Sequence, residues 1–381
     1  MAGVYISFSS LILVVPLSLL LLLYFIVRPK PVRIPVKNRH VFITGGSSGI
    51  GLALAHLCAS HDVSVFSADV RDYEAVKRAV DEAGPIDVLV CNHGVFSAQE
   101  MEEQAVEEIR FMVDVNLIGT FHLIKAALPE MKKDRAARGP GSIAIMSSQA
   151  GQVGIYGYSA YSASKFGLRG LAEALQQEII AEDIHVSLIF PPDTETPGLL
   201  EEKATIEVES DYKRDPLSFN INKCPLEVFG LNRVSLYPVR IGGVSSCVSD
   251  RPIKEPSTNY SSTPAHQTIK RSVKAGIRSA MQETKTRPQL TNIIAASSGA
   301  MKPDEVARKS LKGIQSATFM VPCNVEGFLL SVATAGLSPQ RSCLMAFVEV
   351  MAAGVFRLAG LFFQWNWYGS IAKWHVINRE Q

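Results

Sequence analysis

Two side chains that can perform acid–base chemistry together, Tyr161 and Lys165, lie four residues apart in this sequence. The residues that follow them, as far as Leu175, are mostly helix formers, and in a helix residues four apart share a face. An ammonium group beside a phenol stabilises the phenolate and lowers the tyrosine pKa from its usual value of about 10. A tyrosine tuned in this way can pass a proton to or from a carbinol oxygen. For this motif taken alone, an exposed surface pair is the alternative.

Just upstream, an apolar run from Ile143 to Met146 predicts a strand that ends in an exposed turn at Ser147 and Ser148. A serine hydroxyl at that position can hold the same substrate oxygen as Tyr161. The two serines and the Tyr-x-x-x-Lys spacing together favour catalysis over a plain surface helix, because a nucleotide-binding turn also precedes them.

That turn runs from Thr44 to Gly51, between an apolar strand at Val41–Ile43 and helix formers that begin at Leu52. Glycines allow the backbone to approach a pyrophosphate, and the N-terminus of the helix offers free N–H groups. The spacing is Gly-x-x-x-Gly-x-Gly and differs from the Gly-x-Gly-x-x-Gly fingerprint of dinucleotide folds. The residues predicted to bind a cofactor here are Gly45, Ser47, Ser48, Gly49, Ile50 and Gly51.

Further predicted site residues follow the other strands. Asp69 ends a strand and is placed to bind an adenine amino group or to cap the helix that starts near Tyr73. Asn116 lies in mid-helix, where its amide either opens a polar gap for a water or faces solvent. The remaining cofactor-binding candidates are Asn92, Gly94, Pro191, Thr194 and Thr196. Strands that alternate with helices predict an α/β fold with a doubly wound parallel sheet, whose site lies at the carboxyl ends of the strands.

Together these motifs resemble the short-chain dehydrogenase/reductase family. Thr44 to Gly51 is similar to its cofactor turn, and Asn92-His93-Gly94 is similar to its Asn-Ala-Gly stretch, with His93 in place of alanine. Asn116, Ser148, Tyr161 and Lys165 match its catalytic tetrad, and Ser148 is preferred to Ser147 because its separation from Tyr161 is the usual one. The resemblance implies a nicotinamide cofactor, a proton-donating Tyr161, and a Lys165 that binds the nicotinamide ribose. It also implies that Ser148 positions the substrate and that Asn116 holds a proton-relay water.

Within the family, the chain is most similar to reductases of long-chain sphingoid ketones, the plant type in particular. The stretches that carry this similarity begin at Phe66, Ser147 and Phe190, and the last contains Pro-Pro-Asp-Thr where other members usually have Pro-Gly. The similarity implies NADPH-dependent reduction of 3-ketodihydrosphingosine to dihydrosphingosine at the endoplasmic reticulum membrane, with the catalytic domain facing the cytosol. A long-chain sphingoid ketone and membrane lipid are the implied partners, and a homo-oligomer is compatible with the family.

The chain departs from this pattern in two places. Only Leu52 to Ala68 separates Gly51 from Asp69, so one βα unit of about 30 residues is missing, together with the residue that reads the ribose 2′-phosphate. Residues 203–284 match no known pattern and are expected to be an unstructured insert, either incidental or a lid. The predicted organisation is therefore an anchor at 1–30, a catalytic domain at 38–202 that ends at 285–326, the insert, and a membrane-associated segment at 327–368.

The composition limits the other function classes. The 381 residues carry a net charge of +2, which does not indicate nucleic-acid binding, and the six cysteines have no Cys-x-x-Cys pair, so no metal site is predicted. Residues 4–27 are uncharged and are followed by basic residues from Arg28 to Arg39, which predicts an N-terminal transmembrane helix with the rest of the chain in the cytosol. A cleaved signal peptide is the alternative.

At the C-terminal end, apolar runs at 327–337 and 343–363 are broken by Ser338–Arg341. An aromatic cluster of a kind that favours a membrane interface follows them: Trp365, Trp367, Tyr368 and Trp374. Because Glu349 and Arg357 interrupt the second run, an interfacial or re-entrant hairpin is predicted rather than two spans. A buried C-terminal helix packed on the domain is the alternative. The alternatives for the whole chain are an inactive membrane-bound interaction protein, since half of the adenosine pocket is missing, or a steroid or retinoid dehydrogenase of the same family.

Overall fold

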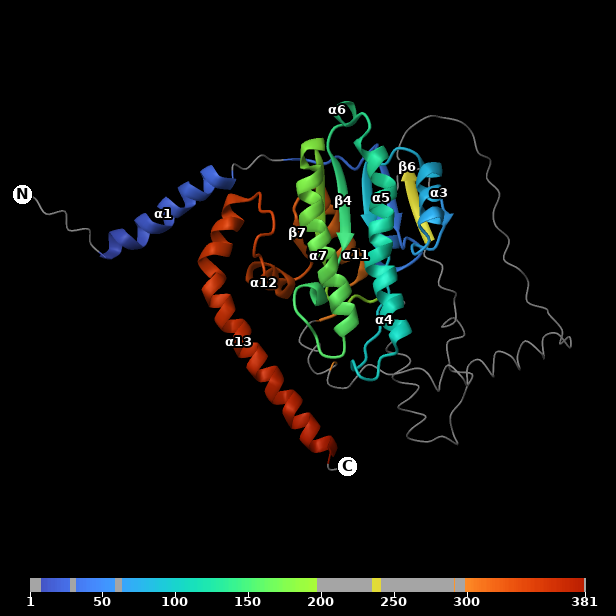
Figure 1. The fold of residues 1–381 in the computed structure, drawn as a ribbon. Coiled ribbons are helices and arrows are strands. Elements are labelled where there is room, and N and C mark those ends of the chain that lie inside the picture. The colour runs from blue at the N-terminus through green and yellow to red at the C-terminus, as the bar shows by residue number, and fades with distance from the viewer. Residues whose placement is uncertain are drawn as a thin grey trace, which may run out of the picture.

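In the part of the chain that the structure describes, a seven-stranded sheet with the order β2-β6-β1-β3-β4-β5-β7 forms the centre of the molecule (Figure 1). The computed structural model describes residues 8–27, 32–58, 64–196, 235–240, 291 and 299–379. Five strands run parallel: β1 (His40–Thr44), β3 (Val88–Cys91), β4 (Gly141–Met146), β5 (Ile184–Phe190) and β7 (Met320–Pro322). The first four are buried along their whole length, which explains why they read as continuous apolar runs rather than alternating ones.

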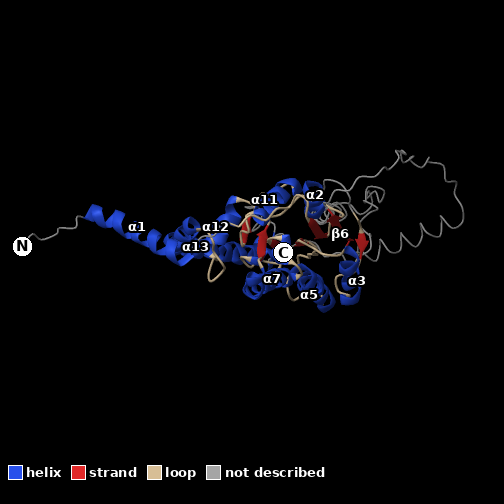
Figure 2. Ribbon diagram, turned by 90° about the horizontal axis from the view of Figure 1, so that it is seen from above, coloured by secondary structure: helices blue, strands red, loops and turns tan. Residues whose placement is uncertain are grey.

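Helices cover both faces of this sheet, as Figure 2 shows. On one face lie α2 (Gly49–Cys58) and α11 (Pro303–Gln315), and on the other α3 (Tyr73–Ala83), α4 (Val106–Val113), α5 (Gly119–Lys132) and α7 (Ser159–Ile179). Short elements complete the body: α6 (Arg135–Arg138), the π-helical turn η1 (Asp114–Ile118), and the 3-10 turns η2 (Gln149–Gly151) and η3 (Ile180–Glu182). The predicted doubly wound α/β fold is therefore confirmed.

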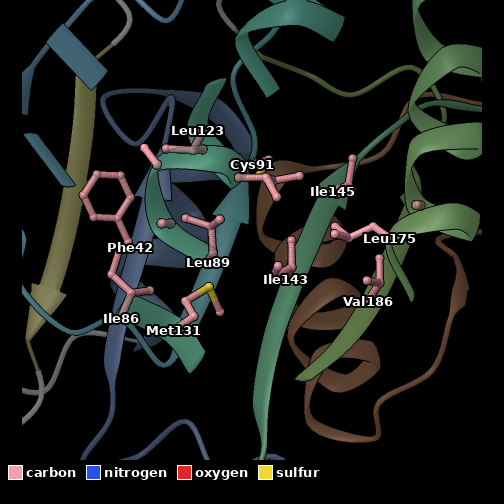
Figure 3. Packing of buried hydrophobic residues seen from close by; sticks show 14 of the residues in the cluster. Phe42, Ile86, Leu89, Cys91, Leu123, Met131, Ile143, Ile145, Leu175 and Val186 are labelled. Carbon is pink, nitrogen blue, oxygen red and sulfur yellow. The ribbon is translucent and has the colours of Figure 1, made fainter. Parts of the chain in front are cut away.

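Two apolar cores hold the layers together. The larger lies between the sheet and α3, α5 and α7, where Phe42, Leu89 and Ile143 of the strands meet Leu123 and Leu175 of the helices (Figure 3). The second lies on the face of α2 and α11 and includes residues of the segment that leads into β1. That segment is tied to the body because the backbone N–H of Ile34 donates to the carbonyl of Gln315 at 2.9 Å. The sheet is thus packed against apolar cores on both of its faces.

The sheet departs from a parallel arrangement at one edge. Strand β6 (Ser235–Arg240) runs antiparallel between β1 and β2 (Phe66–Ser67), with His40 paired to Arg240 and Thr44 paired to Leu236. The expectation of an unstructured insert is thus wrong for these six residues, and the rest of 203–284 lies outside the described residues. In the structure α2 ends at Cys58, and β2 is the next described element. The absence of a βα unit between 52 and 68 stays a prediction.

Three helices lie outside the body on one side. The helix α1 (Phe8–Val27) contacts the start of α13 (Cys343–Arg379), and α12 (Val325–Ala333) lies between α13 and the sheet (Figure 1). Among the described residues, α13 is long and apolar enough to cross a membrane, and only 6% of its apolar window is buried. The helical stretch Val106–Lys132, formed by α4, η1 and α5, passes the same test, and 50% of its apolar window is buried.

These helices correct the predictions for both ends of the chain. The N-terminal segment forms a helix, but its part from Val14 to Val27 counts only as a short apolar helix, so a spanning anchor is not supported. At the C-terminal end the predicted break at Ser338–Arg341 is present, but the segment beyond it is one continuous helix of 37 residues. The apolar pattern predicts an end at Phe363, but the helix continues through Trp365, Trp367 and Tyr368 to Arg379.

Candidate active site

The glycine turn between β1 and α2 packs directly against the loop that follows β3. The side-chain amide of Asn92 donates to the carbonyls of Thr44 at 3.1 Å and Gly45 at 3.2 Å. Gly45 has a φ of +61°, which favours glycine, and a Cβ on Gly51 would lie 2.1 Å from the Gly45 carbonyl oxygen. The turn can therefore be this tight only with glycine at both positions.

The loop after β5 closes the turn from the other side. A Cβ on Gly49 would lie 2.8 Å from Cγ2 of Thr196, so the two segments are in contact. Thr194 is buried and forms a parallel bridge with Met301, while the carbonyl of Pro191 accepts the backbone N–H of Gln149 at 3.1 Å. The residues predicted after β1 and those predicted after β5 are thus brought together.

A chain of buried polar groups runs behind the turn. Thr44 Oγ1 accepts the backbone N–H groups of Asn92 at 2.9 Å and His93 at 3.1 Å, and it lies 2.8 Å from Nδ1 of His93. Burial, reinforced by the nearby Lys165 ammonium, lowers the pKa of His93 to about 3, so the imidazole is neutral. Its Nε2 lies 3.4 Å from Thr120 Oγ1, which in turn donates to the Asn116 carbonyl. His93, the departure from the family's alanine, is therefore a neutral linker between β1 and α5.

Asn116 lies in the π-helical turn η1 that separates α4 from α5, and it is fully buried. Its Nδ2 donates to the Val95 carbonyl and its Oδ1 accepts the Val95 N–H, both at 2.8 Å. A second donation from Nδ2 reaches Ser164 Oγ at 3.1 Å, and that hydroxyl donates to the Tyr161 carbonyl. π-Turns of this kind often occur at functional sites. The amide thus joins the loop after β3 to the helix that carries Tyr161 and Lys165.

The two serines after β4 have different surroundings. Ser147 is buried and its hydroxyl donates to the Lys165 carbonyl at 3.1 Å, so it supports the backbone of α7. Ser148 is partly exposed and caps η2, where its Oγ accepts the backbone N–H of Ala150 at 3.2 Å. The proton of the Ser148 hydroxyl remains available to a ligand, which supports the choice of Ser148 over Ser147 for substrate contact.

Tyr161 and Lys165 lie one turn apart on α7, as their spacing predicts. Lys165 Nζ donates to the Met146 carbonyl at 3.0 Å and lies 5.6 Å from the centre of the Tyr161 ring. Burial lowers the pKa of Lys165 to about 8, so the amine remains largely protonated at neutral pH. Phe96 and Tyr158 hold the Tyr161 ring at centroid distances of 6.1 and 5.6 Å. The lysine cation is thus placed to stabilise a tyrosine phenolate.

These groups line one cavity of about 1040 Å³. Most of the predicted site residues line it: Gly45, Ser48, Gly49, Ile50, Asn92, Gly94, Ser147, Ser148, Tyr161, Lys165, Pro191, Thr194 and Thr196. Gly51 and Asn116 lie behind this surface and shape it. Its far wall was not predicted to belong to the site and comes from α12 and α13, including Glu326, Leu330, Phe356, Phe363 and Trp367. The sequence signal for that wall was the aromatic cluster, which had been assigned to a membrane interface.

Besides Gly51 and Asn116, two further predicted residues are not part of the cavity lining. Ser47 is exposed at the outer side of the turn. Asp69 pairs with Arg71, whose guanidinium contacts both carboxylate oxygens, and this hydrogen bonding lowers the pKa of Asp69. The alternative that Asp69 caps a helix is wrong, because Asp72 caps α3 by accepting the backbone N–H of Ala75.

The cradle fits the diphosphate of a dinucleotide. Gly45, Gly49 and Gly51 leave no room for side chains, so the backbone N–H groups at the start of α2 are open to a ligand, and the helix dipole favours an anion there. Lys165 lines the same cavity, beside Gly94, whose added Cβ would lie 3.3 Å from Nζ. The cavity is also at the upper end of the range for single small-molecule sites, so it has room for a substrate beside a cofactor.

Comparison with known proteins gives a consistent set of relatives. A family profile described as short chain dehydrogenase matches residues 58–206. The 3-dehydrosphinganine reductase TSC10B of Arabidopsis thaliana is 45% identical over 408 residues, covering 100% of this chain and 98% of that protein. TSC10A of the same plant is 46% identical over 376 residues, covering 92% of this chain and 90% of that protein. A 3-dehydrosphinganine reductase of Danio rerio is 29% identical over 402 residues, covering 96% of this chain and 95% of that protein.

Proposed function

The chain belongs to the short-chain dehydrogenase family, and we propose that it reduces 3-ketodihydrosphingosine to dihydrosphingosine with NADPH. The observation that carries the proposal is the meeting of Ser148, Tyr161 and Lys165 with the glycine cradle in one cavity. The far wall of this cavity, from α12 and α13, carries apolar side chains such as Leu330 and Phe356. The relatives that match nearly the full length of the chain are 3-dehydrosphinganine reductases, which supports this substrate over a steroid or a retinoid.

The residues of this chain account for the proton side of the reaction. When bound, the reduced nicotinamide supplies a hydride to the ketone carbon. Ser148 donates a hydrogen bond to the ketone oxygen and orients it, and Tyr161 gives that oxygen its phenolic proton, so that the carbonyl becomes an alcohol. Lys165, held by the Met146 carbonyl, stabilises the phenolate that Tyr161 leaves behind. Solvent then reprotonates the phenol.

Asn116 supports this chemistry by position. Its side-chain amide is engaged with Val95 and Ser164, so it fixes the loop after β3 against α7. The holding of a relay water, which the family resemblance implies for this residue, is a separate proposal.

The choice of NADPH over NADH rests on the resemblance to sphingoid-ketone reductases. Titration with each cofactor, followed by nicotinamide fluorescence, tests it, and equal affinity for the two would refute it. The proposed location is the endoplasmic reticulum membrane with the catalytic domain facing the cytosol. The exposed apolar surface of α13 supports membrane association, and fractionation of cells that express the chain tests it.

The experiment for the activity compares two tyrosines of the same cavity. The purified chain in detergent is given NADPH and 3-ketodihydrosphingosine, and NADPH oxidation is followed. Tyr161→Phe should abolish substrate-dependent oxidation while NADPH binding is kept, whereas Tyr158→Phe, whose ring packs on Tyr161, should remain active. Full activity of Tyr161→Phe would rule out this mechanism, and a wild-type chain that does not bind NADPH would favour an inactive interaction protein.

A further inference from the structure

The far wall of the cavity has an ordered chemical pattern along α12. Glu326, Leu329, Leu330 and Ala333 line the cavity, and their spacing of three, four and seven residues from Glu326 places them on one helix face. That face begins with a carboxylate in the first turn and continues with apolar side chains. It thus matches a ligand that has a cationic head and an apolar chain.

The carboxylate end of α12 is fixed beside Ser148. Asn324, which caps α12, accepts a hydrogen bond from Gln149 Nε2 at 2.7 Å, and Gln149 is the residue after Ser148. Farther along the helix, Gln152 Nε2 donates to Ser331 Oγ at 2.8 Å. Through these bonds the turn that carries Ser148 and the first turn of α12 are held against each other, which keeps Glu326 close to the reacting groups.

The apolar end continues onto α13. Phe356, Gly360, Phe363 and Trp367 line the cavity at intervals of four, seven and eleven residues from Phe356, which is one stripe of that helix. Polar residues of α13 flank this stripe in the lining: Arg357, Gln364, Asn366 and Ser370. A Cβ on Gly360 would meet no atom within 4 Å, so this position leaves open space in the wall. Other apolar side chains of α13, among them Val355, Leu358 and Phe362, are exposed. The same helix therefore borders both the cavity and an exposed apolar surface.

We propose that Glu326 binds the ammonium group of the substrate and that the channel between α12 and the Gly360 stripe of α13 binds its alkyl chain. This inference rests on the proposed function. In that substrate the amine is on the carbon next to the ketone, so its counter-ion must lie near Ser148 and Tyr161. Two acidic residues, Asp193 and Glu326, line the cavity in the described chain, together with the cations Lys165 and Arg357. Asp193 belongs to the loop over the glycine cradle, so Glu326 is the carboxylate on the α12 side.

The first experiment distinguishes loss of amine recognition from a general effect of removing a charge from the first turn of a helix. KM is measured for the amine-bearing ketone and for a ketone of equal length without the amine, with wild type, Glu326→Gln and Glu305→Gln. Glu305 is the matched control, because it lies in the first turn of α11 and is exposed outside the cavity. Glu326→Gln should raise KM about tenfold for the amine substrate only, which corresponds to about 1.4 kcal/mol, and Glu305→Gln should change neither KM.

The second experiment tests the chain channel. Gly360→Leu should reduce turnover of the long-chain ketone far more than that of a short-chain analogue, whereas Gly369→Leu, at an exposed position outside the cavity lining, should leave both unchanged. An unchanged ratio of the two KM values in Glu326→Gln, or equal losses for long and short chains in Gly360→Leu, would overturn the inference. Failure of the wild-type chain to reduce either ketone would instead refute the proposed function, and the inference would fall with it.

Discussion

The buried amide of Asn116 offers the sharpest test of how the site is held together. In Asn116→Ala, both the N–H and the carbonyl of Val95 lose their partner. An unsatisfied buried polar group costs about 1–3 kcal/mol, and Val95 is only partly buried, so water can recover some of that loss. We therefore expect a loss of about 2–4 kcal/mol in the free energy of unfolding, which corresponds to a fall in Tm of roughly 5–10 °C for a domain of this size.

The assay is thermal unfolding of the purified chain in detergent, paired with the NADPH-oxidation rate at a temperature where both proteins are folded. The rate should fall by about a hundredfold, because a shift of about 1 Å in the loop that borders Tyr161 suffices for such a loss. Gln177→Ala is the control, since it removes an exposed amide of α7 and should change stability by less than about 0.5 kcal/mol. If Asn116→Ala keeps the Tm and the rate of wild type, the hydrogen bonds to Val95 do not support the site.

Four further outcomes follow from the structure. Because burial lowers the pKa of Lys165 to about 8, kcat/KM should fall as pH rises through about 8, and Lys165→Arg, which stays charged, should lose this alkaline decline in the pH profile. Gly51→Ala should abolish NADPH binding, since its Cβ meets the backbone at 2.1 Å, whereas Gly154→Ala, with no atom within 4 Å, should bind normally by fluorescence titration. Burial alone would raise the pKa of Asp87, but a backbone N–H and three arginines hold it below its usual value. The contribution of Asp87 to the free energy of unfolding should therefore be complete above about pH 4, and it should be lost as pH falls through the depressed pKa. Asp87→Asn should cost about 3–5 kcal/mol in denaturant unfolding. Removal of 203–284 should reduce the soluble yield and the Tm, because it removes a strand of the sheet.

The parts of the site that sequence could predict are those set by local geometry. Tyr161 and Lys165 share a helix face because of their spacing, and Gly45 and Gly51 mark a turn that only glycine allows. Each of these signals lies within a few residues and depends on backbone conformation alone. The fold class followed for the same reason, since buried parallel strands read as short apolar runs between helices.

The parts that sequence missed depend on contacts between distant segments. Nothing near Asp69 shows that Asp72 takes the helix cap while Asp69 pairs with Arg71. Likewise, the place of Glu326 in the cavity follows from the packing of α12 on the turn after Ser148, across more than 170 residues of sequence. The composition of the aromatic cluster that contains Trp367 is typical of a membrane interface, yet Trp367 lines the cavity. The direction in which a side chain points from a long helix is set by the elements that the helix packs against.

The two departures from the family pattern meet at a single place in the structure. The sequence predicts that a βα unit is absent between Gly51 and Asp69. Such an absence would leave β1 with unpaired N–H and carbonyl groups along one edge, which is a liability for a buried strand. Strand β6 fills that edge and pairs with all five residues of β1 from His40 to Thr44, and it pairs with β2 on its other side. Because β6 runs antiparallel to β1, its N-terminal end lies beside Thr44 and the glycine turn. A parallel strand would place its C-terminal end there. The segment that departs from the family pattern therefore supplies the strand that pairs with β1, next to the glycine turn.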